Sequence, residues 1–186
     1  RDPRGVRPYL GVMALGIGIH ILGDWITSFG TMMLAPLSNH RFALGTTFII
    51  DLLFTGIILA GLLGSMLWRA SRLPALAGLA ILCGYVALQW VQQQRALVFG
   101  EQYAQAQGLA DYQVAALPRP LSPFNWSVYV TAGEQYRVAH VNLRRARTPP
   151  PAAAHDSIIR RLSVGYRPLH DAQWQVIERF GAVGAE

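Results

Sequence analysis

The sequence has 186 residues, of which 52% are hydrophobic and 14% are charged. Because a soluble domain of this size usually carries about 25% charged residues, the composition predicts a protein with part of its surface in lipid. All sixteen basic residues are arginines, and they are scattered along the chain, which argues against a nucleic-acid-binding surface despite the net charge of +6. The single cysteine, Cys83, excludes a disulfide framework.

Three apolar stretches in the first half of the chain predict about three transmembrane helices. They are residues 9–35, 43–68 and 73–91. Each is long enough to cross the roughly 30 Å hydrocarbon core of a bilayer as a helix. Pro36 and Asn39 mark a turn after the first stretch, and Trp68 and Trp90 end the other two, where interfacial aromatic residues are expected. Residues 1–91 are therefore predicted to form a transmembrane helical domain.

The second half of the chain is more polar and predicts a small α+β soluble region. Residues 92–118 are predicted to form an amphipathic helical connector along the membrane surface. In the soluble region, residues 119–186, the alternation over residues 125–143 predicts a β-hairpin. Residues 144–154 contain three consecutive prolines and are expected to be a linker, and residues 171–180 are predicted to form a short helix.

The arginines next to the apolar stretches predict the orientation of the chain in the membrane. On one side of the predicted spans are Arg1, Arg4, Arg7, Arg69 and Arg72, and on the other side are Arg41 and Arg95. Because positive residues are retained on the cytoplasmic side, this bias places the N-terminus in the cytoplasm. With three spans, the C-terminal region is then expected to face outward.

Three ionisable side chains inside the predicted spans form the candidate site. Each costs about 2.5 to 3.5 kcal/mol in a membrane helix unless it has a partner, a cavity or an ion. His20 and Asp24 are four residues apart, so they are expected on one helix face. Asp51 lies between Thr47 and Thr55 at the same spacing, and its polar stripe is expected to face the first one.

This mixture of imidazole and carboxylate predicts a divalent metal site with His20, Asp24 and Asp51 as ligands. Zinc or manganese is the expected ion, with iron also compatible. Asp51 would be either a further ligand or a catalytic base. The alternative is a site without metal, in which His20 and Asp24 bond each other and the threonines satisfy Asp51.

The remaining polar groups have weaker signals. His40 and Arg41, in the loop after the first span, could bind an anionic group of a substrate or act as a general acid, or they could simply be solvated. His140, His155 and His170 lie in separate soluble segments and are expected to be surface residues.

Residues 18–55 resemble the bacterial inner-membrane, metal-dependent hydrolase family that includes YdjM and is described as LexA-regulated. The matching features are His20-x-x-x-Asp24, Thr27, Gly30, Pro36, the Arg41-Phe42 pair and Asp51. The predicted hairpin, with Trp126, Tyr136 and Arg137, resembles the soluble part of many members. Members usually carry an upstream His-Arg-x-x-Thr-His-Ser motif that this sequence lacks, so the chain is expected to be a fragment with an incomplete metal shell.

The resemblance implies a hydrolase in the bacterial inner membrane. The expected reaction is attack of activated water on an ester or phosphoester, and a site near the interface favours a lipid or lipid-linked, anionic substrate. Two other functions remain open from the sequence. One is an ion- or proton-coupled transport protein, for which three spans leave little room, and the other is a non-catalytic membrane scaffold.

Overall fold

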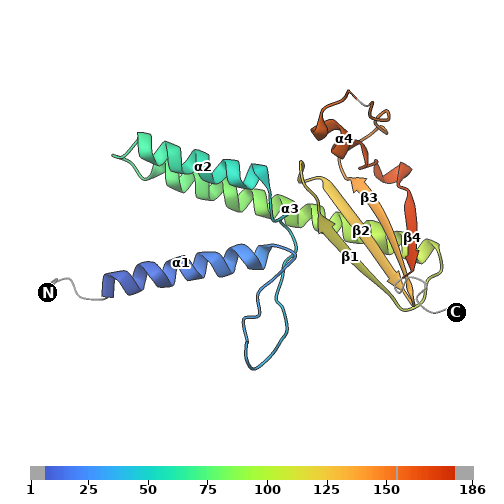
Figure 1. The fold of residues 1–186 in the computed structure, drawn as a ribbon, viewed down its shortest axis with the longest axis horizontal. Helices are drawn as coiled ribbons and strands as arrows, with labels where there is room; N and C mark the ends of the chain where they lie inside the picture. Colours follow the sequence, from blue (N-terminus) through green and yellow to red (C-terminus); the bar gives the residue numbers. More distant parts are fainter. Residues whose placement is uncertain (1–6, 154, 179–186) are drawn as a thin grey trace. The chain divides into compact units, whose positions relative to one another are not determined.

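The computed structural model describes residues 7–153 and 155–178, and it divides the chain into two compact units. The N-terminal unit ends at Ile49 and the C-terminal unit begins at Ile50. The first contains helix α1, and the second contains two long helices and a four-stranded sheet (Figure 1).

The N-terminal unit consists of one helix and a loop that folds back to the helix end. Helix α1, Arg7–Ile26, has 20 residues and is about 30 Å long. The backbone N–H groups of Thr46 and Thr47 both donate to the carbonyl oxygen of Ile26 at 3.0 Å. The prediction of a helix up to residue 35 is therefore wrong, because residues from 27 onward bond across the loop rather than along a helix.

Gly30 shows why this loop closes so tightly. It has a φ of +64°, and a Cβ atom there would lie 2.6 Å from the carbonyl oxygen of Phe42. Thr31 and Phe42, next to this contact, exchange two backbone hydrogen bonds of 3.0 Å. The last part of the first apolar stretch, residues 27–35, thus belongs to a returning loop and not to the helix (Figure 1).

In the C-terminal unit, helices α2 and α3 pack against each other as an antiparallel pair. Helix α2, Leu52–Leu67, begins only at Leu52, because Asp51 caps it, and not at residue 43 as predicted. Helix α3, Leu73–Ala106, has 34 residues and continues far beyond Trp90. The two backbones meet at Gly78, where a Cβ atom would lie 3.1 Å from the Cα atom of Gly61.

An antiparallel sheet with strand order β1-β2-β3-β4 follows the helices. The strands are β1 (Tyr112–Pro118), β2 (Asn125–Ala132), β3 (Gln135–Asn142) and β4 (Trp174–Glu178). Strands β2 and β3 confirm the predicted hairpin over residues 125–143. Between β3 and β4 lie the short helix α4, Ile158–Val164, and a single 3-10 turn, Leu169–Asp171.

Two helical predictions in this region are wrong. The predicted connector over residues 92–118 does not exist as one helix, because residues up to 106 belong to α3 and residues 112–118 are strand β1. Gly108, at φ +63°, ends the helical course, and β1 then pairs with β2 along its whole length. The predicted helix over residues 171–180 is strand β4 within the described residues, because it pairs with β3.

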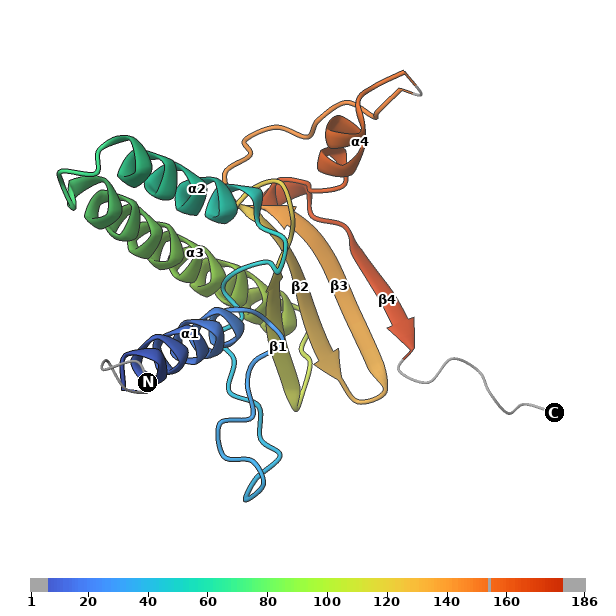
Figure 2. The ribbon, with the colours of Figure 1, turned by 60° about the vertical axis from the view of Figure 1, so that its left-hand side comes forward.

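The C-terminal half of α3 covers one face of the sheet (Figure 2). Small buried residues of α3, among them Ala96 and Gly100, let the helix approach the fully buried Trp126 and Val128 of β2. Trp174 of β4 stacks on the ring of Tyr103 with the centroids 3.8 Å apart. Helix α3 is therefore both a membrane-type helix and the core helix of the sheet.

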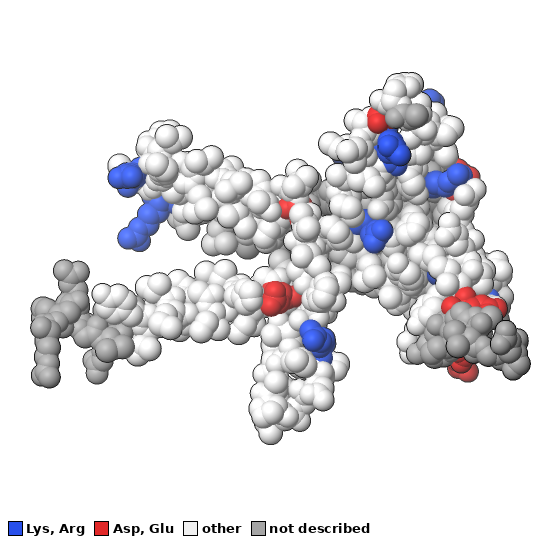
Figure 3. Space-filling model, viewed as in Figure 1, with Lys and Arg blue, Asp and Glu red and all other residues white. Residues whose placement is uncertain are grey.

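The helical surface is suited to lipid. Tyr9–Ile26 and Leu73–Ala106 are long and apolar enough to cross a membrane, whereas Leu52–Leu67 is apolar but has only 16 residues. Figure 3 shows these helices almost free of charged groups, with basic side chains gathered at the end of the α2–α3 pair. The two arginines of that turn are Arg69 and Arg72.

Candidate functional site

Asp51 is the most heavily hydrogen-bonded side chain of the candidate site. Its Oδ1 atom accepts from the backbone N–H groups of Leu53, at 2.9 Å, and Phe54, at 3.0 Å. Its Oδ2 atom accepts from the hydroxyl of Tyr85 and from Nε2 of Gln89, both at 2.8 Å. Asp51 thus caps α2 and also fastens the start of α2 to α3.

This arrangement constrains the chemistry that is open to Asp51. A carboxylate offers about four lone-pair positions, and four donors already fill them here. To ligate a metal or to accept a proton as a base, Asp51 would have to give up Tyr85, Gln89 or part of its cap. The alternative to the metal site, in which threonines satisfy Asp51, is not what the structure shows, because Oδ2 of Asp51 accepts from Tyr85 and Gln89 instead.

His20 and Asp24 lie together on α1, as their spacing predicts. Nε2 of His20 is 3.5 Å from Oδ2 of Asp24, and the two side chains are 79% and 50% exposed. Among the residues that the structure describes, no group of three or more His, Cys, Asp or Glu side chains is placed to hold a metal. Because His20 and Asp24 belong to the N-terminal unit and Asp51 to the other, a shared ion stays a prediction.

His40 and Arg41 lie in the returning loop of the N-terminal unit, and both are exposed. The backbone N–H of His40 donates to Oγ of Ser38 at 3.1 Å, and its ring meets the edge of Phe42 with centroids 4.8 Å apart. The loop thus holds His40 at a fixed place while leaving its imidazole accessible. The roles predicted for the pair in binding or proton transfer stay predictions.

A cavity of about 260 Å³ borders Asp51 and was not anticipated from the sequence. Its walls are the start of α2, the turn between β1 and β2, and Ile159 of α4. Arg119 and Ser122 contribute polar groups, and Leu52 and Leu53 contribute apolar ones. The only local sign of Arg119 in the sequence is its position between two prolines, which does not suggest a site.

A second polar cluster adjoins Arg119 on the sheet. Oγ of Ser127 lies 2.7 Å from Nδ1 of His140, and Nε of Arg119 donates to the hydroxyl of Tyr166 at 3.3 Å. Burial, together with the guanidinium of Arg119, lowers the pKa of His140 below its usual value. His140 is therefore partly buried and not a free surface residue as predicted, whereas His155 and His170 are exposed.

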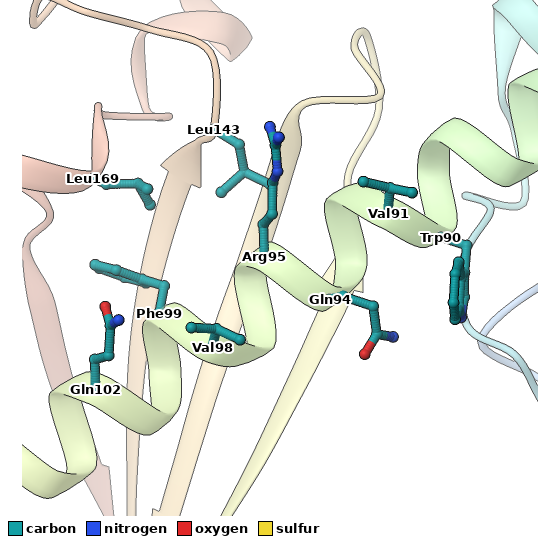
Figure 4. A pocket seen from close by; sticks show the side chains of 9 residues that line it. All are labelled: Trp90, Val91, Gln94, Arg95, Val98, Phe99, Gln102, Leu143 and Leu169. Atoms are coloured by element: carbon teal, nitrogen blue, oxygen red, sulfur yellow. The ribbon is translucent and has the colours of Figure 1, made fainter.

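A larger cavity, of about 580 Å³, runs along the outer side of α3. Figure 4 shows Val91, Val98 and Phe99 lining it, with the guanidinium of Arg95 beside Leu143. The described residues that line this groove include no acidic group and no imidazole. Its surface is suited to apolar contact rather than to hydrolytic chemistry.

Comparison with known proteins places the chain in a family. The model of the YdjM inner membrane protein family matches residues 3–96, just over half of the chain, and includes α1, the returning loop, α2 and most of α3. No curated protein and no solved structure matches the chain. The family match covers His20, Asp24, His40, Arg41 and Asp51, and it agrees with the apolar helices in pointing to a membrane location. The chain belongs to the YdjM inner membrane protein family.

Proposed function

We propose that this protein is a multi-pass membrane hydrolase that depends on a divalent metal ion and cleaves an ester or phosphoester of a lipid or lipid-linked substrate. The proposal rests on one observation, the geometry of His20 and Asp24 on α1. These two ionisable side chains are exposed on an otherwise apolar helix of membrane-spanning length. Polar groups in such a place are generally retained for a function.

The distance between the two side chains fits a pair of metal ligands. Nitrogen and oxygen ligands lie about 2.1 Å from zinc, and at a tetrahedral angle two of them are therefore about 3.4 Å apart. Nε2 of His20 and Oδ2 of Asp24 are separated by 3.5 Å. A direct hydrogen bond would instead bring them to about 2.7 to 3.2 Å. Zinc or manganese fits this donor set, with water or further groups completing the shell.

His40 and Arg41 of the N-terminal unit are the proposed partners of the metal in the reaction. A divalent ion, when bound, would act as a Lewis acid and would lower the pKa of a bound water toward neutrality. Arg41 would hold the anionic group of the substrate, because a guanidinium can bond two oxygens at once. His40, held by Ser38 through its backbone, would give a proton to the leaving group.

In this proposal Asp51 is a positioning residue and not primarily a metal ligand or a base. Its carboxylate would serve as a ligand or a base only after losing one of its four present donors. We therefore assign Asp51 first to positioning, since it fixes the start of α2 against α3. This observation also favours the second candidate function, a non-catalytic membrane scaffold in which the polar residues of the spans serve helix packing.

For the membrane topology we propose three spans, α1, α2 and α3, in the bacterial inner membrane, with the C-terminal sheet in the periplasm. Helix α2 is about 24 Å long, short of the hydrocarbon core, but its ends carry the exposed Leu52 and Trp68. Arg69 and Arg72 would lie in the cytoplasm.

Cys83 allows this topology to be tested directly. As the only cysteine, it can be replaced by serine to give a background without thiols. Single cysteines at Ser71 and at Ser157 are then labelled in intact cells with a reagent that does not cross the membrane. Labelling is expected at residue 157 and not at residue 71, and the reverse pattern would overturn the proposed orientation.

Metal analysis tests the function itself. The full-length protein, purified without chelator, is expected to hold close to one zinc or manganese ion, and His20→Ala is expected to lose most of it. His155→Ala is the matched control, because His155 is an exposed imidazole outside the site. If the unaltered protein holds no metal, or if His20→Ala holds as much metal as the unaltered protein, the non-catalytic membrane scaffold describes the function better than the hydrolase.

A further inference from the structure

We propose that the cavity between α2 and the sheet binds the phosphate-bearing headgroup of a membrane phospholipid, with Arg119 as the residue that holds the phosphate. This inference goes beyond the proposed function, because it needs neither the metal nor hydrolysis. Arg119, Ser122 and Ile159 also lie outside the residues that match the family.

The donors of Arg119 are the first argument. A guanidinium has five N–H donors, and Arg119 uses only Nε, which donates to Tyr166. Neither terminal nitrogen donates to any residue of 7–153 or 155–178, although both belong to a side chain that lines the cavity. Tyr166 thus fixes the guanidinium and leaves its outer edge for a ligand, which suits two oxygens of a phosphate.

The neighbouring polar groups are consistent with an anion. Oγ of Ser122 accepts from the backbone N–H of Phe124 at 3.3 Å, and its own hydroxyl proton has no acceptor among the residues that the structure describes. The carboxylate that lines the cavity is Asp51, and its oxygens accept from four donors of α2 and α3. Arg119 is therefore the charged group of the cavity that still has donors to offer.

The apolar walls identify a lipid rather than a free phosphate compound. Leu52 and Leu53 are 67% and 51% exposed at the point where the apolar helix α2 begins. Ile159 of α4 lines the other side and is 64% exposed, next to Ile158, which is 73% exposed. Arg160 and Arg161 follow on the same short helix. Exposed apolar residues beside arginines are typical of a surface at the level of lipid headgroups.

The experiment measures binding of dioctanoyl-phosphatidylglycerol to the complete chain in non-ionic detergent by native mass spectrometry. Arg119→Gln is expected to weaken binding about tenfold or more, since hydrogen bonds to a charged group are lost. Arg147→Gln is the matched control, because it removes the same charge from an exposed loop residue outside the cavity. Equal binding by Arg119→Gln and the unaltered chain would overturn the proposal.

Two further probes separate the parts of the ligand. Dioctanoylglycerol has the chains without the phosphate, and glycerol 3-phosphate has the phosphate without the chains. Both are expected to bind much more weakly than the phospholipid. If dioctanoylglycerol binds as tightly as the phospholipid, Arg119 does not hold the phosphate. If glycerol 3-phosphate binds as tightly as the phospholipid, the ligand of the cavity is a small anion and not a lipid. His20→Ala is expected to bind the phospholipid unchanged, so this result is independent of the metal.

A measurement on the unaltered chain covers the case that Arg119→Gln fails to fold. The guanidinium of Arg119 contributes to the lowered pKa of His140. A phosphate bound to Arg119 would offset that charge, so the pKa of His140, followed by nuclear magnetic resonance, is expected to rise when the phospholipid is added. His140→Gln identifies the resonance. An unchanged pKa at saturating phospholipid would overturn the proposal.

Discussion

The hydroxyl of Tyr85 donates a hydrogen bond to Oδ2 of Asp51 across 2.8 Å, and in doing so it joins the middle of α3 to the residue that caps α2. Gln89, one turn later on α3, donates to the same oxygen. Both contacts cross between two apolar helices, where unpaired polar groups are costly. This one carboxylate therefore helps to fix the register of the α2–α3 pair, together with the close approach of Gly61 and Gly78.

Tyr85→Phe is expected to destabilise the protein by about 1.5 to 3 kcal/mol, the usual range for a hydrogen bond to a charged group. The ring remains, so packing is kept while Oδ2 of Asp51 loses one donor. Thermal unfolding in detergent measures the change. Tyr129→Phe serves as the control, because the hydroxyl of Tyr129 forms no hydrogen bond within the described residues. Equal effects of the two changes would show that the contact contributes nothing specific.

Asp51→Ala is expected to have a larger effect, about 3 kcal/mol or more, because it removes a helix cap together with the carboxylate oxygen that accepts from Tyr85 and Gln89. Asp51→Asn, which keeps one carbonyl oxygen, is expected to be milder. If Asp51 acts mainly in positioning, metal content per folded molecule stays the same in Asp51→Asn. A loss of metal without a loss of stability would instead make Asp51 a ligand.

The sequence predicted local features well, because local patterns determine them. The i,i+4 spacing of His20 and Asp24 placed them on one helix face, and the alternation around Gly133 predicted the β2–β3 hairpin. The helix ends were missed for a physical reason. Hydropathy does not distinguish an apolar helix from an apolar loop, and the loop after Ile26 is held by bonds to distant residues.

The role of Asp51 as a helix cap was not predicted, for a similar reason. An aspartate directly before an apolar run is a typical helix cap, but an unbroken apolar stretch around it favoured an intramembrane position. Its partners are 34 and 38 residues away, so they become visible only when α2 and α3 are paired. The sequence held one sign of these partners. Tyr85 and Gln89 are polar residues four positions apart within the predicted span 73–91, a spacing that places both on one helix face.

Gly100→Ala tests how closely α3 approaches the sheet. A Cβ atom at this position would lie 2.5 Å from Cγ1 of Val114 and 2.8 Å from Cγ1 of Val128. Forcing the helix outward is expected to cost about 1 to 3 kcal/mol, measured by denaturant unfolding. Gly84→Ala on the same helix has nothing within 4 Å, so it is expected to be neutral or slightly stabilising. Similar losses in both variants would contradict the packing described for Gly100.

Trp174→Ala tests whether stacking on α3 secures the edge strand β4. The ring of Trp174 stacks on Tyr103 and also on Phe99, at 5.6 Å between centroids. Its removal is expected to cost about 2 kcal/mol or more and to increase amide hydrogen exchange in β4. Val176→Ala in the same strand removes a residue that is 57% exposed and is expected to change little. Unchanged exchange in Trp174→Ala would mean that pairing with β3 alone holds the strand.

The lowered pKa of His140 predicts how stability depends on pH. Burial is the larger cause and the guanidinium of Arg119 the smaller one, and both disfavour the protonated imidazole in the folded chain. The unfolded chain takes up this proton near pH 6.5, before the folded chain does, so stability is fully present above that pH and falls as the pH drops through the folded pKa.

Unfolding measured from about pH 7.5 to about pH 5 is therefore expected to show a decline that His140→Gln reduces. His155→Gln, an exposed histidine, is expected to leave the decline unchanged. Arg119→Gln is expected to reduce it only in part, because burial of His140 remains. A decline of the same size in His140→Gln and in the unaltered chain would place its origin elsewhere. A partial effect of Arg119→Gln would show that the charge of Arg119, beside the cavity, lowers the pKa of His140 on strand β3.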